Sequence, residues 1–215
     1  MPTNRPLPSL RDEMRRILAV AVSLANLQDH DFEILREMSE VCLPWAEGLA
    51  TEIRTILEAN EATRIYTATY LNGDPAGWYR GLFQAPDVQT FWFQQMNLAV
   101  EHVRNDVPNE VVVGLAPRWL NLLGQRARQH LPPERARLFT QVMPHILSGT
   151  VTVMVATYEM VMLRTFMQET GFSKILVKRL QQNTLKSLAE QMMEEQRKCK
   201  AEAESPDSLS SLTPS

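Results

Sequence analysis

The residues best suited to chemistry in this chain are its four histidines, and one of them lies in an unusual setting. His102 occurs in NLAVEHVRNDVP (97–108), a mostly apolar segment with helical spacing that breaks at Pro108. His102 follows Leu98 by one helical turn, so the two share a face near the free carbonyls of the helix end. Spacing alone leaves three interpretations open: a buried structural histidine, a surface residue, or a ligand.

The other three histidines have simpler explanations. His30 lies between two aspartates at a predicted helix start, which favours a surface role. His130 ends a predicted helix, where a partly positive imidazole complements the helix dipole. His145 follows Pro144 in a long apolar segment, and we interpret it as a core or interface group.

Sequence signatures of common catalytic sites are missing. The chain has no P-loop, no Gly-rich dinucleotide loop, no nucleophile elbow and no His-Glu-x-x-His pair. Its two cysteines, Cys42 and Cys199, are far apart and too few for a zinc site or a disulfide framework. Neighbouring carboxylates such as Glu194 and Glu195 are interpreted as a solvated helix face. We therefore expect a protein that is not an enzyme.

Composition narrows the class of protein and its compartment. The 215 residues are 44% hydrophobic and 22% charged, which suits a globular core, and a net charge of -3 argues against a general nucleic-acid binder. The N-terminal segment is polar and Pro-rich, unlike a signal peptide. The most apolar run, 151–163, includes Glu159 and is shorter than the roughly 20 residues of a membrane span. We expect a cytoplasmic protein without a membrane segment.

Helical periodicity and scarce glycine predict an all-α chain. Apolar residues recur at three- and four-residue spacing, without the turn signals that join alternating β-strands. VTVMVATY (151–158) alternates like a strand, but the periodicity around it favours a helix. Residues 143–167 are apolar nearly all round, which indicates a helix buried on all sides, between its own core and a second subunit. Helices are expected at 9–27, from 29 or 31 towards 42, at 44–60, 61–70, 75–83, 85–106, 108–130, 131–171 and 174–199.

The chain is expected to hold one folded domain with extensions. Residues 1–8 are predicted to be a flexible N-terminus, 9–171 the domain, and 172–200 a C-terminal helix. Residues 201–215, AEAESPDSLSSLTPS, are low in complexity and predicted to be disordered. All lysines lie at or beyond Lys174, so the C-terminal part also differs in composition.

One segment resembles a known family. FQAPDVQTFWFQQMNLAVEHVRNDVPNEVVVG (83–114) is similar to the heme-binding segment of the sensor globins, the family of globin-coupled sensors and protoglobins. That family has a Trp-containing helix ending in Phe, a short Gly/Pro/Asp linker, and a helix ending in His-Val-Arg before a Pro. The matching segments here are WYRGLF (78–83), QAPD (84–87) and EHVRNDVP (101–108). LPPERARLF and LSGTVTVMVATYEM resemble the start of the family's last helix and its long dimer-forming helix, and the resemblance covers roughly residues 9–165.

The resemblance implies a globin fold with an extra N-terminal helix and a C-terminal helical extension, in a single-domain member without the usual transmitter module. It implies that His102 is the proximal ligand of a heme b iron, where a neutral imidazole binds through one ring nitrogen and donates its other N–H to an acceptor. A diatomic gas (O2, CO or NO) would bind or be sensed at that iron. A homodimer through 108–130 and 134–167 and a protein signalling partner are also expected. The pocket is expected to include Leu98, Leu49, Ile53, Leu71, Trp78 and Phe83.

The sequence departs from the family on the gas-binding side of the expected pocket. The family's frequent Tyr in the second core helix falls at Leu49, Ala50 or Thr51. A later Tyr of the family falls near Val112. A pocket without these hydroxyls disfavours hydrogen-bonded oxygen, and some family members have lost heme. The alternative is therefore a heme-free globin-like interaction module with a filled core and a partner bound through the last two helices. A generic helical scaffold or an enzyme of another kind is the third possibility.

Overall fold

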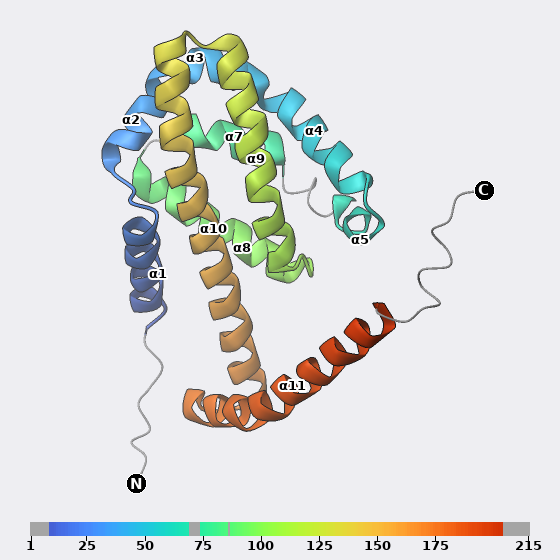
Figure 1. The fold of residues 1–215 in the computed structure, drawn as a ribbon. Coiled ribbons are helices and arrows are strands. Elements are labelled where there is room, and N and C mark those ends of the chain that lie inside the picture. Colours follow the sequence, from blue (N-terminus) through green and yellow to red (C-terminus); the bar gives the residue numbers. More distant parts are fainter. Residues whose placement is uncertain (1–8, 69–73, 86, 204–215) are drawn as a thin grey trace, which may run out of the picture. The chain divides into compact units, whose positions relative to one another are not determined.

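The computed structural model describes residues 9–68, 74–85 and 87–203, and this part of the chain is helical without strands, which confirms the all-α prediction (Figure 1). Three predictions fall on other residues: Leu71 in the pocket, the flexible segment 1–8, and the tail beyond Ala203. The described helices are α1 (Leu10–Leu24), α2 (Asp29–Glu37), α3 (Ser39–Cys42), the 3-10 turn η1 (Leu43–Trp45), α4 (Ala46–Glu58), α5 (Glu61–Arg64), α7 (Pro75–Gln84), α8 (Val88–Arg104), α9 (Asn109–His130), α10 (Pro133–Thr170) and α11 (Lys174–Ala203).

The chain divides into two compact units, and the division falls inside α10. Residues 8–164 form the larger unit, which holds α1 to α9 and most of α10. The described part of the smaller unit is 165–203, which comprises the end of α10 and α11. Helix α11 continues to Ala203, past the predicted end at 199. The site described below lies wholly within the larger unit.

Side-chain caps fix the starts of α7 and α8, which are two of the four helices that carry the site. The Asp74 carboxylate accepts the backbone N–H of Gly77 at 2.8 Å, and Asp74 itself has a left-handed backbone with φ of 50°. The Asp87 carboxylate accepts the backbone N–H of Thr90 at 2.7 Å and so starts α8. These bonds satisfy donors that a helix leaves unpaired at its first turn. The hydrogen bonds from Thr90 also hold the pKa of Asp87 below its ordinary value.

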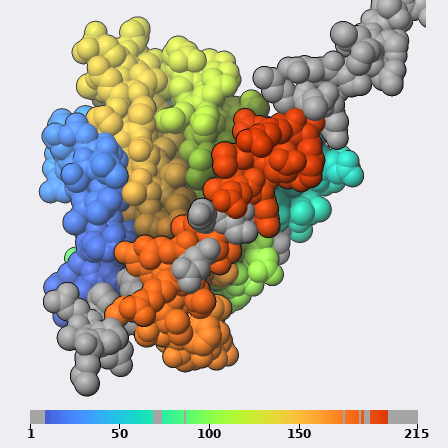
Figure 2. All heavy atoms as spheres, turned by 60° about the horizontal axis from the view of Figure 1, so that its bottom comes forward, coloured from blue at the N-terminus to red at the C-terminus, as the bar shows by residue number. Residues whose placement is uncertain are grey.

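Helices α1 and α2 pack along α10, so the extra N-terminal helix is part of the larger unit. The Glu13 carboxylate accepts the Nε–H of Arg164 at 2.7 Å, and the Glu13 side chain is 9% exposed. On α2, an Asp31 carboxylate oxygen lies 3.6 Å from Nδ1 of His145 on α10. Between these two contacts, Gly149 of α10 has no side chain, so the segment that follows α1 can approach α10 closely. In Figure 2 the α1–α2 segment lies beside the first half of α10.

The packing of α4 against α7 forms another part of the core. Leu49 and Ile53 on α4 are 0% exposed. On α7, the Tyr79 hydroxyl donates a 3.0 Å hydrogen bond to the backbone carbonyl of Cys42, and the Tyr79 ring meets the Phe83 ring at 5.1 Å in a T-shaped contact. Burial raises the pKa of the Cys42 thiol to about 12 and also raises that of Tyr79. Both groups are therefore neutral structural elements at physiological pH.

Several helix ends differ from the predicted ones for local reasons. The first helix ends at Leu24 rather than 27, because Asn26 adopts a left-handed φ of 51° that reverses the chain. Of the helix predicted at 61–70, Glu61–Arg64 form α5, a turn follows at 65–66, residues 67–68 are helical again, and 69–70 lie outside the described residues. Helix α4 begins at Ala46 after a 3-10 turn. Helix α9 runs through Pro117 for its full 22 residues.

Helix α10 is the longest element described, and it contains a long apolar stretch. By length and composition alone it could cross a membrane, and 39% of its most apolar 18-residue stretch is buried within the protein. Core helices of soluble proteins meet the same criterion, so this observation does not separate the two cases. The strand-like run 151–158 lies inside this continuous helix, as the surrounding periodicity predicted.

Candidate functional site

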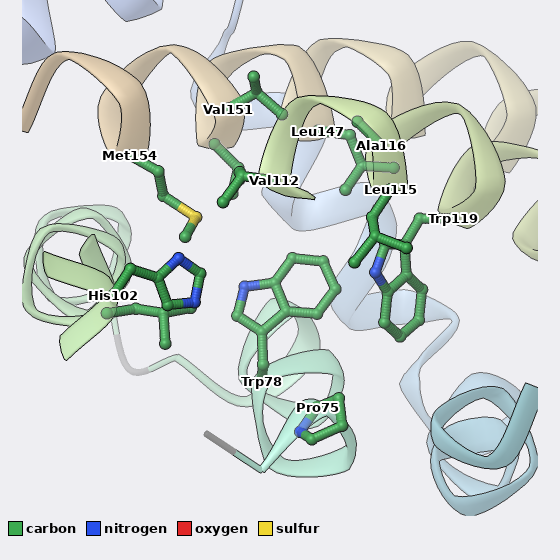
Figure 3. A pocket seen from close by; sticks show the side chains of 12 residues that line it. Pro75, Trp78, His102, Val112, Leu115, Ala116, Trp119, Leu147, Val151 and Met154 are labelled. Carbon is green, nitrogen blue, oxygen red and sulfur yellow. The ribbon is translucent and has the colours of Figure 1, made fainter. Parts of the chain in front are cut away.

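A cavity of about 50 Å³ lies between α7, α8, α9 and α10. This volume holds about three to five water molecules, at roughly 10–15 Å³ each. Its walls are mostly apolar, and the His102 ring and the indole groups of two tryptophans face it (Figure 3). The lining residues are Pro75, Trp78, Leu98, His102, Val112, Leu115, Ala116, Trp119, Leu147, Thr150, Val151 and Met154.

His102 occupies the last turn of α8 and points inward. It is 7% exposed, and its backbone carbonyl accepts the N–H of Val107 at 2.9 Å as the chain leaves the helix. Burial lowers the pKa of His102 below its ordinary 6.5, because a charged imidazolium is poorly solvated among apolar walls. The side chain is therefore a neutral imidazole at physiological pH, the form that binds a metal through a ring nitrogen.

Trp78 fills the space between His102 and α9. In Figure 3 its indole lies between the His102 imidazole and the Trp119 ring. The two indoles have centroids 4.9 Å apart and are tilted by 56°. The Trp78 Nε1–H donates a 2.9 Å hydrogen bond to Oε1 of Gln95, a residue of α8 that is 2% exposed. Trp78 is thus held by a ring contact on one side and a polar contact on the other.

The structure brings together three of the residues predicted for a heme pocket. His102, Leu98 and Trp78 all line the cavity. Leu49, Ile53 and Phe83 are buried, but they do not line it. The two α4 residues are used in helix packing, and Phe83 makes a T-shaped contact with Tyr79. Leu71 lies outside the described residues.

The pocket residues named from the sequence include none on α9 or α10, although the long helix over 131–171 was expected to form part of the pocket. Leu115 and Trp119 are four residues apart on α9, and Leu147, Val151 and Met154 follow one another at spacings of four and three on α10. These spacings mark an inward helix face, but they occur in every core helix and do not say which cavity the face lines. The Trp119 ring was the one available signal, because a large aromatic on an inward face fills considerable volume.

The remaining histidines lie elsewhere. His30 is on the surface, with Nδ1 3.3 Å from the Glu33 carboxylate. His130 is exposed and lies 5.8 Å from the Trp45 ring, centroid to centroid. His145 pairs with Asp31 as described above. His102 therefore differs from the other three in lining the apolar cavity.

The donor set suits a heme better than a metal held by protein ligands alone. Within the described residues, no group of three or more His, Cys, Asp or Glu side chains converges on one point. A porphyrin supplies most of the ligands itself and needs one neutral imidazole and apolar walls, which this cavity offers. The volume does not match in the present arrangement, since pockets for large organic ligands enclose roughly 300–1,000 Å³. A porphyrin would fit only if the Trp78 indole left the space beside His102.

Neither the family models nor the curated proteins compared with this sequence give a match.

Proposed function

We propose that this chain is a globin-type heme protein that binds or senses a diatomic gas at an iron held by His102. One observation carries the proposal: His102 is a buried, neutral imidazole that lines an apolar cavity between four helices. The globin fold, with α1 as the additional N-terminal helix and α11 as the extension, is part of the same proposal. Bound heme b would supply the iron position at which O2, CO or NO binds.

The chain's own groups have distinct tasks under this proposal. His102 supplies the neutral nitrogen, and Leu98, one turn earlier on α8, covers the same face. Val112, Leu115 and Met154 give the cavity apolar walls, which would protect a bound iron from oxidation and which favour the neutral imidazole. Gases such as CO and NO need little polar assistance, and these apolar walls suit them better than a ligand that requires a hydrogen bond.

The test is a heme titration of the purified chain followed by absorption spectroscopy. Wild type should develop a strong Soret band, and His102→Ala should lose it or hold heme far more weakly. Free imidazole added to the His102→Ala protein should restore the band, because it can replace the missing ligand. His30→Ala, which removes an exposed histidine, is the matched control and should behave as wild type. A wild type that stays colourless, or a His102→Ala spectrum equal to wild type, contradicts the proposal.

A heme-free interaction module is the second candidate, and one observation favours it. The Trp78 indole already lies beside His102, with the Trp119 ring against its other side. A core filled by the chain's own side chains needs no cofactor, and the last two helices would then serve to bind a protein partner. This candidate predicts no Soret band at any heme concentration and no effect of His102→Ala beyond a change in stability.

We also propose a homodimer formed through α9 and α10. Val113 on α9 is 49% exposed and Met162 on α10 is 50% exposed, although both lie on largely apolar helices. Large exposed apolar groups on long helices are typical of a subunit interface. Light scattering should give twice the 24.6 kDa of one chain, and Met162→Glu should shift the mass towards one chain. A wild-type mass of 24.6 kDa at micromolar concentration would exclude this dimer.

A further inference from the structure

The two indoles that line the cavity differ in how deeply they are buried. Trp119 is 3% exposed and belongs to the fixed inner face of α9. Trp78 is half-buried, and it lies one turn from the start of α7, which begins at Pro75. A side chain that is partly exposed near a helix start has solvent on one side towards which it can rotate, whereas the buried Trp119 has not. If either ring leaves the cavity, it is therefore Trp78.

One hydrogen bond holds the inward position of Trp78. Its Nε1–H donates to Oε1 of Gln95, and the Gln95 amide nitrogen in turn donates to the backbone carbonyl of Phe91 at 3.4 Å. Gln95 is buried, so its side chain cannot follow an outward movement of the indole. Rotation of Trp78 breaks the bond, and solvent then provides another acceptor for the indole N–H.

We propose that Trp78 is a displaceable plug, which fills the space beside His102 in the empty protein and leaves it when a large planar ligand enters. The inference rests on the proposed function for the identity of that ligand, a porphyrin. It goes further by assigning Trp78 and Gln95 the control of ligand uptake. The protein then has a closed and an open form, and its apparent affinity for the ligand is reduced by the fraction of molecules that are closed.

The first test weakens the closed form without altering the cavity walls. Gln95→Leu removes the acceptor while keeping side-chain size, and Gln94→Leu makes the same change at the neighbouring exposed position of α8 as a matched control. Loss of one such hydrogen bond should raise the rate of heme uptake by about 2- to 12-fold over wild type. Gln94→Leu should leave the rate unchanged. Equal uptake rates for the two variants would overturn the proposal.

A second readout requires no heme. Two indoles 4.9 Å apart and tilted by 56° couple electronically and give a paired signal in the near-ultraviolet circular dichroism spectrum. Replacing Trp78 by Phe identifies that signal. Gln95→Leu should diminish it relative to Gln94→Leu, and heme uptake by wild type should abolish it. A paired signal that is the same in both glutamine variants counts against the plug.

A third measurement separates failure of the plug from failure of the heme proposal. Trp78→Ala vacates the volume of one indole beside an existing cavity, and apolar cavities of this kind bind small aromatic molecules. Free indole should raise the thermal unfolding temperature of Trp78→Ala and not that of wild type. If no variant takes up heme, but indole stabilises Trp78→Ala and Gln95→Leu still diminishes the paired signal relative to Gln94→Leu, the porphyrin assignment fails and the plug stands. If indole has no effect on a folded Trp78→Ala, the plug fails. If that variant does not fold, the Gln95→Leu measurements decide.

Discussion

Gly149 offers a quantitative test of how α10 is packed. A Cβ placed on Gly149 would lie 2.4 Å from Cδ1 of Leu27 and 2.9 Å from Cη2 of Trp92. Leu27 is 8% exposed and Trp92 3% exposed, so neither has free space into which it can move. Gly114 on α9 is the matched control, because a Cβ there meets nothing within 4 Å. Both positions are inside helices, and both variants are Gly→Ala.

The expected effects follow from two terms. Replacing Gly by Ala inside a helix stabilises the folded state by about 0.8–1 kcal/mol, and this gain applies at both positions. Overpacking a well-filled core costs about 1–3 kcal/mol, and this loss applies only at Gly149. The helix term cancels in the difference between the two variants. Gly149→Ala should therefore have a free energy of unfolding about 1–3 kcal/mol lower than Gly114→Ala, and Gly114→Ala should exceed wild type.

Urea unfolding followed by far-ultraviolet circular dichroism measures this difference. With equal denaturant slopes, the shift in midpoint gives the difference in free energy of unfolding directly. If Gly149→Ala unfolds at the same urea concentration as Gly114→Ala, or at a higher one, then the chain does not approach α10 at Gly149 as closely as the structure has it.

Three further predictions concern buried polar groups. Because the pKa of His102 is lowered in the folded heme-free protein, below about pH 6.5 the unfolded chain binds a proton that the folded chain does not. The free energy of unfolding should therefore fall as pH decreases through 6.5, by at most about 1.4 kcal/mol per pH unit. His102→Gln should lack this component when urea unfolding is measured at pH 5 to 7. Cys42, with its pKa raised to about 12 by burial, should remain unmodified by iodoacetamide in the native protein and react after unfolding, as mass spectrometry of its peptide would show; rapid native labelling would argue against its burial. Glu13→Gln should lower the free energy of unfolding by about 1–3 kcal/mol, because it weakens the bond to Arg164. Arg104→Ala, which removes an exposed ion pair, should change the free energy of unfolding by less than about 0.5 kcal/mol. Equal effects of the two variants would mean that α1 is not anchored to α10.

Local patterns predicted the helices because each helix needs its own apolar stripe. The expected starts and ends were within a few residues for most of them, including the helix over 151–158 that alternates like a strand. The errors have local causes that a periodicity does not contain. Asn26 ends the first helix early through its left-handed backbone, and the break around Pro44 divides the chain into α3, a 3-10 turn and α4.

The candidate site was only partly predictable, because its composition depends on contacts distant in sequence. His102 and Leu98 could be placed on one face from their spacing alone. The contact of Trp78 with Trp119 joins two helices, and nothing local to either residue specifies the partner. Gly149 illustrates the same limit: a glycine within a long apolar helix does not say what lies against it, whereas the structure places Leu27 there.

The burial of His102 and the inward position of Trp78 are linked physically. The indole of Trp78 lies beside the imidazole and excludes water from the space that it fills, so it contributes to the desolvation that lowers the pKa of His102. A change that turns the indole outward in the heme-free protein, such as Gln95→Leu, should admit water to His102 and move its pKa back towards 6.5. The pH dependence of stability attributed to His102 should then become shallower in Gln95→Leu than in Gln94→Leu. Nuclear magnetic resonance titration of the His102 ring protons in both variants measures this directly, and identical titration curves would show that Trp78 does not control access to His102.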